Sequence, residues 1–433
     1  MEDDKVLVQT IDELVQETYK PDEPGAAVIV VKDSNIIYRE GYGMANLELG
    51  VPIKPEMVFR IGSITKQFTA VATLILADQG KLAIDDPISK FLPEYPTQGH
   101  LITVEHLLTH TSGIKSYTEL PELWASSRND FTVQQIIDAF KNRPMDFTPG
   151  EECSYNNSGY VLLGAIIEKS SGLTYEQFVQ QNIFDRLGMK NSYYDDPVRV
   201  IPHRVSGYSK SAKGCTNAAY LSMTLPYAGG SLASTVDDLA IWDTALYSEQ
   251  LVKQETLRRA FTPFRLNDGS MTEYGFGWTV SEYEGHRLIQ HGGGVSGFAA
   301  YAIRVPDEHV FVAVLSNLSG YSPEQLVFEI AGLAIGIPYK EPTPIEVSPE
   351  ILCRYEGKYR KNAAMEWQFT VENGQLIYRN PRYELVPIST NEFFPKGWSV
   401  SRIIFKTDSL GEAISLEIRR RDGTIQRAKK VNQ

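Results

Sequence analysis

Cysteines and long apolar runs are scarce in this chain of 433 residues. Its three cysteines, Cys153, Cys215 and Cys353, are too few and too widely separated for a disulfide framework. No apolar stretch approaches the roughly 18 residues that a membrane-spanning helix needs, so we expect no membrane span. The first residues are mostly acidic and do not resemble a signal peptide. The localisation therefore stays open: cytoplasmic as the chain is written, or exported as a mature form without its leader.

Basic charge is also scarce. The chain has 42 lysines and arginines against 54 aspartates and glutamates, a net charge of −12. Its densest basic run, Arg419–Arg421, lies in an alternating strand pattern, so no basic patch for nucleic acid or an anionic membrane is expected. His106 and His110 are four residues apart on an expected helix, but no glutamate follows His106 as a zinc protease requires. We therefore expect no nucleic-acid partner, no metal and no other cofactor.

The length and apolar content are sufficient for two domains. A chain of this size exceeds one ordinary core, and 42% hydrophobic with 22% charged residues is typical of a folded protein. Four prolines between Pro338 and Pro349 indicate a linker. We expect a first domain over residues 1–338, a linker over residues 339–348 and a second domain over residues 349–433.

The first domain is expected to have strands at both ends and helices between them. Apolar alternation predicts strands over residues 26–31, 36–42, 277–281, 286–290, 298–304 and 310–315. Helical periodicity predicts helices over residues 5–19, 104–109, 133–142, 157–169, 175–187 and 323–335, one after Gly62 and one capped by Ser234-Thr235. This order indicates an α+β fold with one antiparallel sheet built from both ends. Weak periodicity over residues 190–227 indicates long loops over a site.

The second domain is expected to be a small β-barrel or sandwich. Short alternating segments recur at residues 355–360, 366–372, 375–378, 384–387, 402–406, 413–419 and 425–430. Asn373-Gly374 and Asp422-Gly423 are typical hairpin turns between such strands.

A first chemical signal lies in residues 59–68. Gly62 permits a turn, so Ser63 would stand at the start of the apolar helix that follows, at the positive end of its dipole. Lys66, three residues later, would lie on the same face. A lysine in a partly dry site can lose its proton and accept that of a serine hydroxyl. The same spacing recurs at Ser112 and Lys115, but Thr111-Ser112-Gly113 is turn chemistry that would leave Ser112 off any helix.

A second signal is Tyr155-Asn156-Asn157, just before an expected helix. A tyrosine near the serine can act as a base, and an asparagine can position the pair. The alternative interpretation is a helix cap, for which asparagine is a good residue. The pattern recurs at Tyr378-Arg379-Asn380 in a short strand of the second domain, where we discount it.

A third signal is His291-Gly292-Gly293-Gly294 at the end of a strand. Glycines there let a substrate lie against the strand edge, and one N–H can face an oxyanion. The run also fits a dinucleotide fingerprint with Gly297, but no helix opens after it. It imitates the oxyanion loop of α/β-hydrolases as well, yet the chain has no Gly-x-Ser-x-Gly motif.

Together, in the order Ser63, Tyr155 and His291, the three motifs are far more specific than any one alone. With them the chain resembles the serine β-lactamase and penicillin-binding-protein superfamily, in its branch of class C β-lactamases, alkaline D-peptidases, D-aminopeptidases and family VIII esterases. Supporting stretches lie at residues 59–63, 106–113, 155–160, 229–235 and 274–278. The resemblance covers roughly residues 5 to 338, and the rest looks like the lipocalin-like domain appended to some members.

The resemblance implies a metal-free serine hydrolase with an acyl-enzyme on Ser63. Lys66 and Tyr155 would share the base and acid work. The N–H groups of Ser63 and Gly294 would form the oxyanion hole. The expected partner is a small-molecule or short-peptide substrate, and a homo-oligomer stays open.

The resemblance also implies that Asn157, Gly293 and His291 bind substrate. His291 is a departure, because β-lactamases and carboxypeptidases usually carry lysine there. An unperturbed histidine titrates near pH ~6.5, so a cationic anchor for a substrate carboxylate would fade around neutrality. Otherwise His291 would position the strand or the tyrosine. We therefore expect activity on esters, amides or D-amino-acid peptides.

Two alternative functions remain open. Within enzymes, the alternative is a D,D-carboxypeptidase or penicillin-binding protein, or a weak β-lactamase. From another class, it is a non-catalytic protein that keeps the fold and binds cell-wall fragments.

Overall fold

The computed structural model describes residues 2–196, 198–211, 214–338, 342–362, 365–379, 382–396, 401–419 and 425–431. The chain divides into two compact units, Met1–Pro338 and Tyr339–Gln433. Within the described ranges, no helix is both long and apolar enough to cross a membrane.

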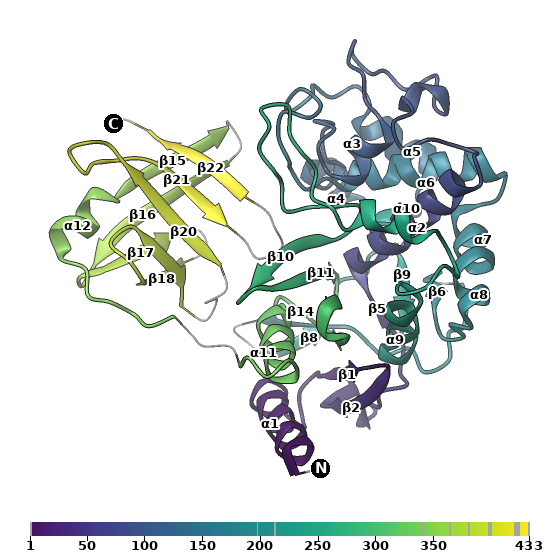
Figure 1. Cartoon of the computed structure of the whole chain (residues 1–433), viewed down its shortest axis with the longest axis horizontal. Coiled ribbons are helices and arrows are strands. Elements are labelled where there is room, and N and C mark those ends of the chain that lie inside the picture. The colour runs from purple at the N-terminus through teal and green to yellow at the C-terminus, as the bar shows by residue number, and fades with distance from the viewer. Residues whose placement is uncertain are drawn as a thin grey trace. The chain divides into compact units, whose positions relative to one another are not determined.

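Six antiparallel strands form the central sheet of the first unit (Figure 1). In order across the sheet they are β10 (Thr279–Tyr283), β11 (His286–Val295), β12 (Phe298–Val305), β13 (Val310–Ser316), β1 (Ala26–Lys32) and β2 (Asn35–Tyr42). β1, near the start of the unit, pairs with β13, near its end, and Ala26 lies opposite Ser316. The expected α+β class and the antiparallel sheet built from both ends are therefore confirmed.

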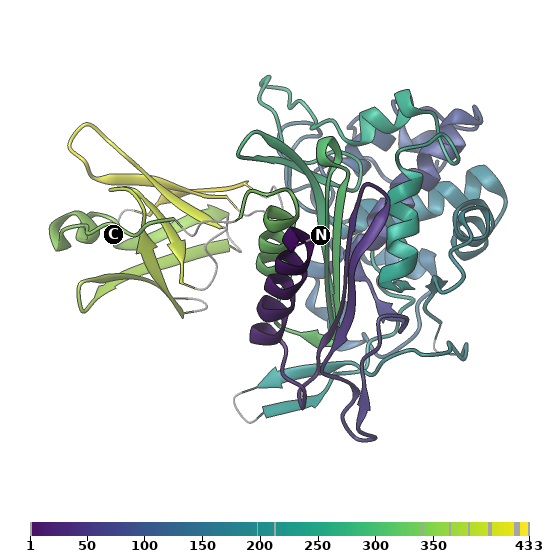
Figure 2. The ribbon, with the colours of Figure 1, turned by 60° about the horizontal axis from the view of Figure 1, so that its bottom comes forward.

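Helices cover both faces of this sheet, which explains the unbroken apolar sequence of its middle strands. β12 and β13 are buried along their whole length. On one face, α1 (Glu2–Thr18) and α11 (Glu324–Ala334) lie side by side, while α9 (Val236–Ala245) contacts β1 and β13 from the other (Figure 2). α2 (Thr65–Asp78) and α6 (Asn157–Ser171) pack against each other in the helical region.

The remaining elements of this unit are short. The helices are α3 (Val104–Leu108), α4 (Pro121–Ala125), α5 (Val133–Phe140), α7 (Tyr175–Val179), α8 (Asp185–Leu187) and α10 (Gln254–Ala260). The strands are β3 (Met44–Asn46), β4 (Val51–Pro52), β5 (Phe59–Arg60), β6 (Tyr193–Tyr194), β7 (Tyr208–Ser211), β8 (Gly214–Asn217), β9 (Leu232–Ser234) and β14 (Leu318–Ser319). A π-helical turn joins α7 to α8, so the helix expected over residues 175–187 is present with a bulge. β6, β7 and β8 lie in the region expected to be loops.

Two strands differ from their expected bounds. β11 continues through the glycine run to Val295, five residues beyond the expected end, because β12 pairs with it up to that residue. β10 begins at Thr279, because Gly277 has a φ of +84° and lies against α2. A Cβ on Gly277 would stand 2.7 Å from the carbonyl oxygen of Lys66, so only glycine fits this contact.

The second unit contains a closed eight-stranded barrel. Its strands are β15 (Gly357–Asn362), β16 (Met365–Glu372), β17 (Gln375–Arg379), β18 (Arg382–Pro387), β19 (Glu392–Pro395), β20 (Arg402–Thr407), β21 (Ala413–Arg419) and β22 (Ile425–Lys430). The short helix α12 (Pro349–Arg354) precedes them. A buried cluster rich in aromatic side chains fills the barrel; its aromatic members are Tyr355, Tyr359, Trp367, Phe369, Phe393 and Phe405. Of the two expected turns, Asn373-Gly374 has positive φ at both residues, while Asp422-Gly423 lies outside the described residues.

Candidate active site

Ser63 stands where the chain passes from β5 to α2. It lies in a single 3-10 turn, Gly62–Ile64, directly before the first residue of α2. Gly62 has a φ of +51°, and a Cβ there would stand 2.6 Å from the backbone nitrogen of Gly294. A Cβ on Gly293 would stand 1.9 Å from the carbonyl oxygen of Ile61. Because both positions are glycine, the Ser63 turn can lie directly against the glycine run of β11.

The side chain of Lys66 is fully buried beside Ser63. Its Nζ lies 3.0 Å from Ser63 Oγ, 2.7 Å from Asn157 Oδ1 and 2.8 Å from the carbonyl oxygen of Gly229. Burial lowers the pKa of this amine well below its usual value. A neutral amine has two N–H donors and one lone pair, which match two carbonyl acceptors and one hydroxyl. An uncharged Lys66 fits this geometry with its lone pair toward the Ser63 hydroxyl.

Asn156 and Asn157 have different roles in the local structure. Asn156 caps α6, because its Oδ1 accepts a hydrogen bond from the N–H of Gly159 at 2.9 Å. Asn157, the first residue of the helix, turns its side-chain oxygen to Lys66 instead. The helix cap is therefore made by Asn156, while Asn157 contacts Lys66.

Tyr155 lies against the same lysine. Its ring centroid is 4.8 Å from Lys66 Nζ, and its ring packs 4.4 Å from that of His110 and 6.0 Å from that of His291, centroid to centroid. Ser63, Lys66, Tyr155 and Asn157 are thus brought together, although Ser63 and Asn157 are far apart in the sequence.

His291 is buried, and both of its ring nitrogens have partners. Nδ1 donates to the carbonyl oxygen of Gly292 at 2.5 Å, which leaves Nε2 to accept from the hydroxyl of Tyr274 at 2.8 Å. Burial is the main cause that lowers the pKa of His291, to about 3. The sequence led us to expect that His291 titrates near neutral pH. The pKa in the structure is lower because the ring is buried, and the sequence alone does not show this burial.

The second Ser-x-x-Lys spacing, at Ser112 and Lys115, does not form a serine–lysine pair in the structure. Ser112 lies in a turn and accepts from the N–H of Ile114. Lys115 pairs with Glu119 and with Asp146, at 3.2 Å from the latter, so its amine does not serve Ser112.

The two histidines of the zinc-like spacing do not share a helix face. Thr103 caps α3, and His106 completes the capping box, since its Nδ1 accepts from the N–H of Thr103. His110 lies beyond the helix with a φ of +60°, and its Nδ1 accepts from the N–H of Asn156. Among the described residues, no group of three or more His, Cys, Asp or Glu side chains could hold a metal ion.

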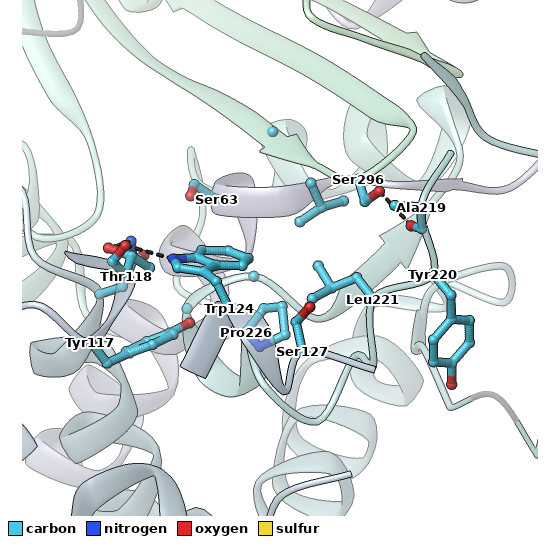
Figure 3. Close-up of a pocket in the computed structure, with 15 residues that line it drawn as sticks. Ser63, Tyr117, Thr118, Trp124, Ser127, Ala219, Tyr220, Leu221, Pro226 and Ser296 are labelled. Carbon is cyan, nitrogen blue, oxygen red and sulfur yellow. Dashed lines mark hydrogen bonds between the residues drawn. The ribbon is translucent and has the colours of Figure 1, made fainter. Parts of the chain in front are cut away.

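A pocket of about 370 Å³ opens beside Ser63 (Figure 3). Asn157, Gly229 and Gly294 line it, as do Trp124, which lies beside Ser63 in Figure 3, and Tyr220. Sequence analysis missed several of these neighbours. Gly229 lies in a stretch that carried the resemblance, but its carbonyl contact with Lys66 spans 163 residues. Trp124 gave no signal, since it lies on a helix of five residues.

Known proteins resemble this chain in sequence and in fold. The sequence profile of the family described as Beta-lactamase matches residues 7–331. Penicillin-binding protein 4* of Bacillus subtilis is 31% identical over 402 residues, which cover 86% of this chain and 88% of that protein. The D-aminopeptidase of Gluconobacter oxydans is 28% identical over 323 residues, which cover 73% of this chain and 60% of that protein. The solved structure of the octameric penicillin-binding protein homologue from Pyrococcus abyssi superimposes with a TM-score of 0.69 at 26% identity, covering 98% of this chain and 99% of that one.

Proposed function

Since the chain belongs to the β-lactamase family of serine hydrolases, we propose that it hydrolyses esters, amides or D-amino-acid-containing peptides through an acyl-enzyme on Ser63. The observation that carries the proposal is the surroundings of Lys66. Its buried amine contacts the serine hydroxyl and two neutral carbonyl oxygens, which favours the uncharged form that a base requires.

Acylation begins with the Ser63 hydroxyl. Its Oγ attacks the substrate carbonyl carbon while its proton passes to the lone pair of Lys66. The carbonyl oxygen becomes an oxyanion, and the N–H groups of Ser63 and Gly294 are the donors proposed for it. The close contact between Gly62 and the Gly294 nitrogen supports this assignment, since it keeps the two N–H groups near each other.

Collapse of the tetrahedral intermediate breaks the bond to the leaving group. The departing oxygen or nitrogen takes up the proton now held by Lys66, directly or through the Tyr155 hydroxyl. A water molecule then attacks the Ser63 ester, giving its proton to the same pair, and the carboxylic acid is released with Ser63 restored. Asn157 and Gly293 would hold the substrate during both steps.

His291 has a positioning role in this proposal. Its ring is buried and its nitrogens bind Gly292 and Tyr274, so it offers no cation to a substrate carboxylate. A D,D-carboxypeptidase or penicillin-binding protein, or a weak β-lactamase, is the second candidate function. It is favoured by the relative named penicillin-binding protein 4*, which is alignable over most of both chains.

Covalent labelling tests the proposal against the non-catalytic alternative. A fluorophosphonate should label the wild-type protein and the Ser112→Ala variant, and should not label Ser63→Ala. A protein that only binds cell-wall fragments, with an idle serine, would stay unlabelled in all three forms. A panel of p-nitrophenyl esters, D-amino-acid amides, D-Ala-D-Ala peptides and nitrocefin then separates the two enzymatic candidates.

We also propose that the chain assembles into a homo-oligomer. The support is the Pyrococcus abyssi homologue, which is described as octameric and aligns over nearly the whole of both chains. Light scattering coupled to size exclusion measures the assembly, and a monomer across the micromolar range would contradict the proposal.

A further inference from the structure

Besides Ser63 and Asn157, three segments from distant parts of the sequence build the walls of the pocket (Figure 3). The first runs from Tyr117 to Ser127, the second from Ala219 to Gly230, and the third is the end of β11 with Ser296. Hydrogen bonds join the walls: Ser296 Oγ donates to the carbonyl oxygen of Ala219 at 2.6 Å. The N–H of Ser222 donates to the carbonyl oxygen of Ser127 at 2.9 Å. The pocket is therefore a defined shape rather than a gap between loose loops.

Much of the lining of this pocket is apolar or aromatic. Large side chains in the lining include those of Trp124, Tyr220, Leu221, Pro226 and Val295. The indole N–H of Trp124 donates to the carbonyl oxygen of Thr118 at 2.7 Å, which fixes the plane of the ring. Trp124 still exposes 46% of its surface, so an apolar ligand against it would remove that surface from water.

None of the described residues that line the pocket is charged. The guanidinium of Arg128 lies 5.7 Å from the centroid of the Tyr220 ring, but Arg128 is exposed and does not line the pocket. Solvent and salt screen such a charge. A charged group inside the pocket would lose part of its hydration without gaining an ionic partner from the described lining.

The acyl part and the leaving group of a substrate lie on opposite sides of the scissile bond. In the proposed mechanism the leaving group takes its proton from Lys66, directly or through Tyr155, and so departs on the side of Tyr155. Tyr155 and His291 do not line the pocket, whereas Ser63 and Gly294 do. We therefore assign the pocket to the part of the substrate that stays on the serine.

We propose that this pocket selects an uncharged, apolar acyl group, with Trp124 and Leu221 as the residues that recognise it. The inference rests on the proposed acylation of Ser63 and narrows its substrate class. Acyl donors with a free ammonium group or a second carboxylate are disfavoured, whereas aromatic or branched aliphatic acyl groups fit.

Three matched p-nitrophenyl esters measure this selection. They are the esters of phenylacetic acid, 4-carboxyphenylacetic acid and 4-(aminomethyl)phenylacetic acid, which differ in charge and share a leaving group. At pH 7.5 we expect kcat/KM for the neutral ester to exceed both charged ones at least tenfold. Arg128→Gln should leave this preference unchanged. Equal kcat/KM values for the three esters would overturn the inference.

Ser127 is a small polar residue of the pocket lining. A carboxylate introduced at this position tests whether the pocket can be made to accept the cationic ester. Ser127→Asp should raise kcat/KM for the cationic ester at least tenfold relative to the neutral one, while Ser127→Asn, of nearly the same size, should not. Trp124→Ala should lower kcat/KM for the neutral ester at least tenfold. A Ser127→Asp protein that acylates normally and gains nothing for the cation would contradict the inference.

Failure of the acyl-enzyme proposal can be told apart from failure of this one. The first shows as the same hydrolysis rate in Ser63→Ala as in the wild type, or as no hydrolysis in either. The second shows as Ser63-dependent hydrolysis without charge discrimination. Where no acyl-enzyme forms, calorimetry of phenylacetamide and its 4-carboxy and 4-aminomethyl analogues with Ser63→Ala still tests the pocket: tighter binding of the neutral amide supports it, and equal binding overturns it.

Discussion

Lys66 Nζ lies 3.0 Å from Ser63 Oγ, and the three hydrogen-bond partners of this fully buried amine are all uncharged groups. A protonated lysine in such surroundings would lack the counter-charge that ordinarily stabilises it. Burial therefore lowers the pKa of Lys66 well below the unperturbed lysine value of about 10.4.

The first prediction concerns the protonation of Lys66. Because burial lowers its pKa, kcat/KM should rise as the amine loses its proton and should level off well below the ordinary lysine pKa. Lys66→Arg keeps a permanent cation and should lose about 10²- to 10⁴-fold in kcat/KM, the usual contribution of general base catalysis. Lys115→Arg is the matched control, since Lys115 pairs with Glu119 and Asp146, and it should keep full activity. An active Lys66→Arg enzyme would refute the base assignment.

The second prediction concerns His291 and substrate charge. Since its pKa is lowered to about 3, His291 stays neutral throughout the range of pH 5 to 9. The ratio of kcat/KM for an anionic and a neutral ester of the same alcohol should therefore be flat over that range. A ratio that falls as pH rises past about 6.5, the unperturbed histidine value, would restore the cationic anchor that the sequence first suggested.

The third prediction concerns stability at acid pH. The folded pKa of His291 lies below the unfolded value, so the unfolded state binds more protons between these two pH values and stability falls as pH falls. Between pH 7 and pH 4 this one group should cost about 3 kcal/mol of unfolding free energy. Urea titrations of the wild type and of His291→Gln should show the difference, with the variant losing less. Parallel losses in both proteins would mean that His291 does not carry the effect.

The fourth prediction compares two neighbouring glycines. Gly293→Ala would place a methyl group 1.9 Å from the carbonyl oxygen of Ile61, whereas a Cβ on Gly294 meets no atom within 4 Å. We expect Gly293→Ala to lose about 1–3 kcal/mol of stability and most of its activity, because the Ser63 turn must move. Gly294→Ala should keep its melting temperature. Equal melting temperatures in the two variants would show that the turn does not depend on this contact.

The fifth prediction concerns the independence of the first domain. The large core of the first unit is assembled from residues between Ala27 and Leu315, and the second unit has a buried cluster of its own. A chain ending near Pro342 should therefore fold and melt cooperatively by circular dichroism. Truncated protein that is repeatedly molten, under conditions in which the full chain is folded, would indicate one inseparable core.

The sequence was most informative where structure is local. The turn at Gly62 and the spacing of Ser63 and Lys66 depend on one glycine and one helical repeat, so both could be predicted. The capping of α6 by Asn156 is equally local. The α+β class followed from the order of strands and helices along the chain.

Long-range packing explains what the sequence could not show. The contact of Lys66 with the Gly229 carbonyl joins segments 163 residues apart. The neutrality of His291 depends on Tyr274 and on burial beneath several elements, neither of which has a local pattern. β11 was predicted too short because glycines weaken a strand pattern, although β12 holds them in register.

Mass spectrometry of the trapped intermediate tests the central claim most directly. The protein is incubated with a slowly hydrolysed ester, quenched in acid and digested, and the acyl adduct is located by peptide mapping. We predict an adduct on the peptide that contains Ser63, in the wild type and in Ser112→Ala, and none in Ser63→Ala. An adduct on Ser112, or full turnover by Ser63→Ala, would contradict the account.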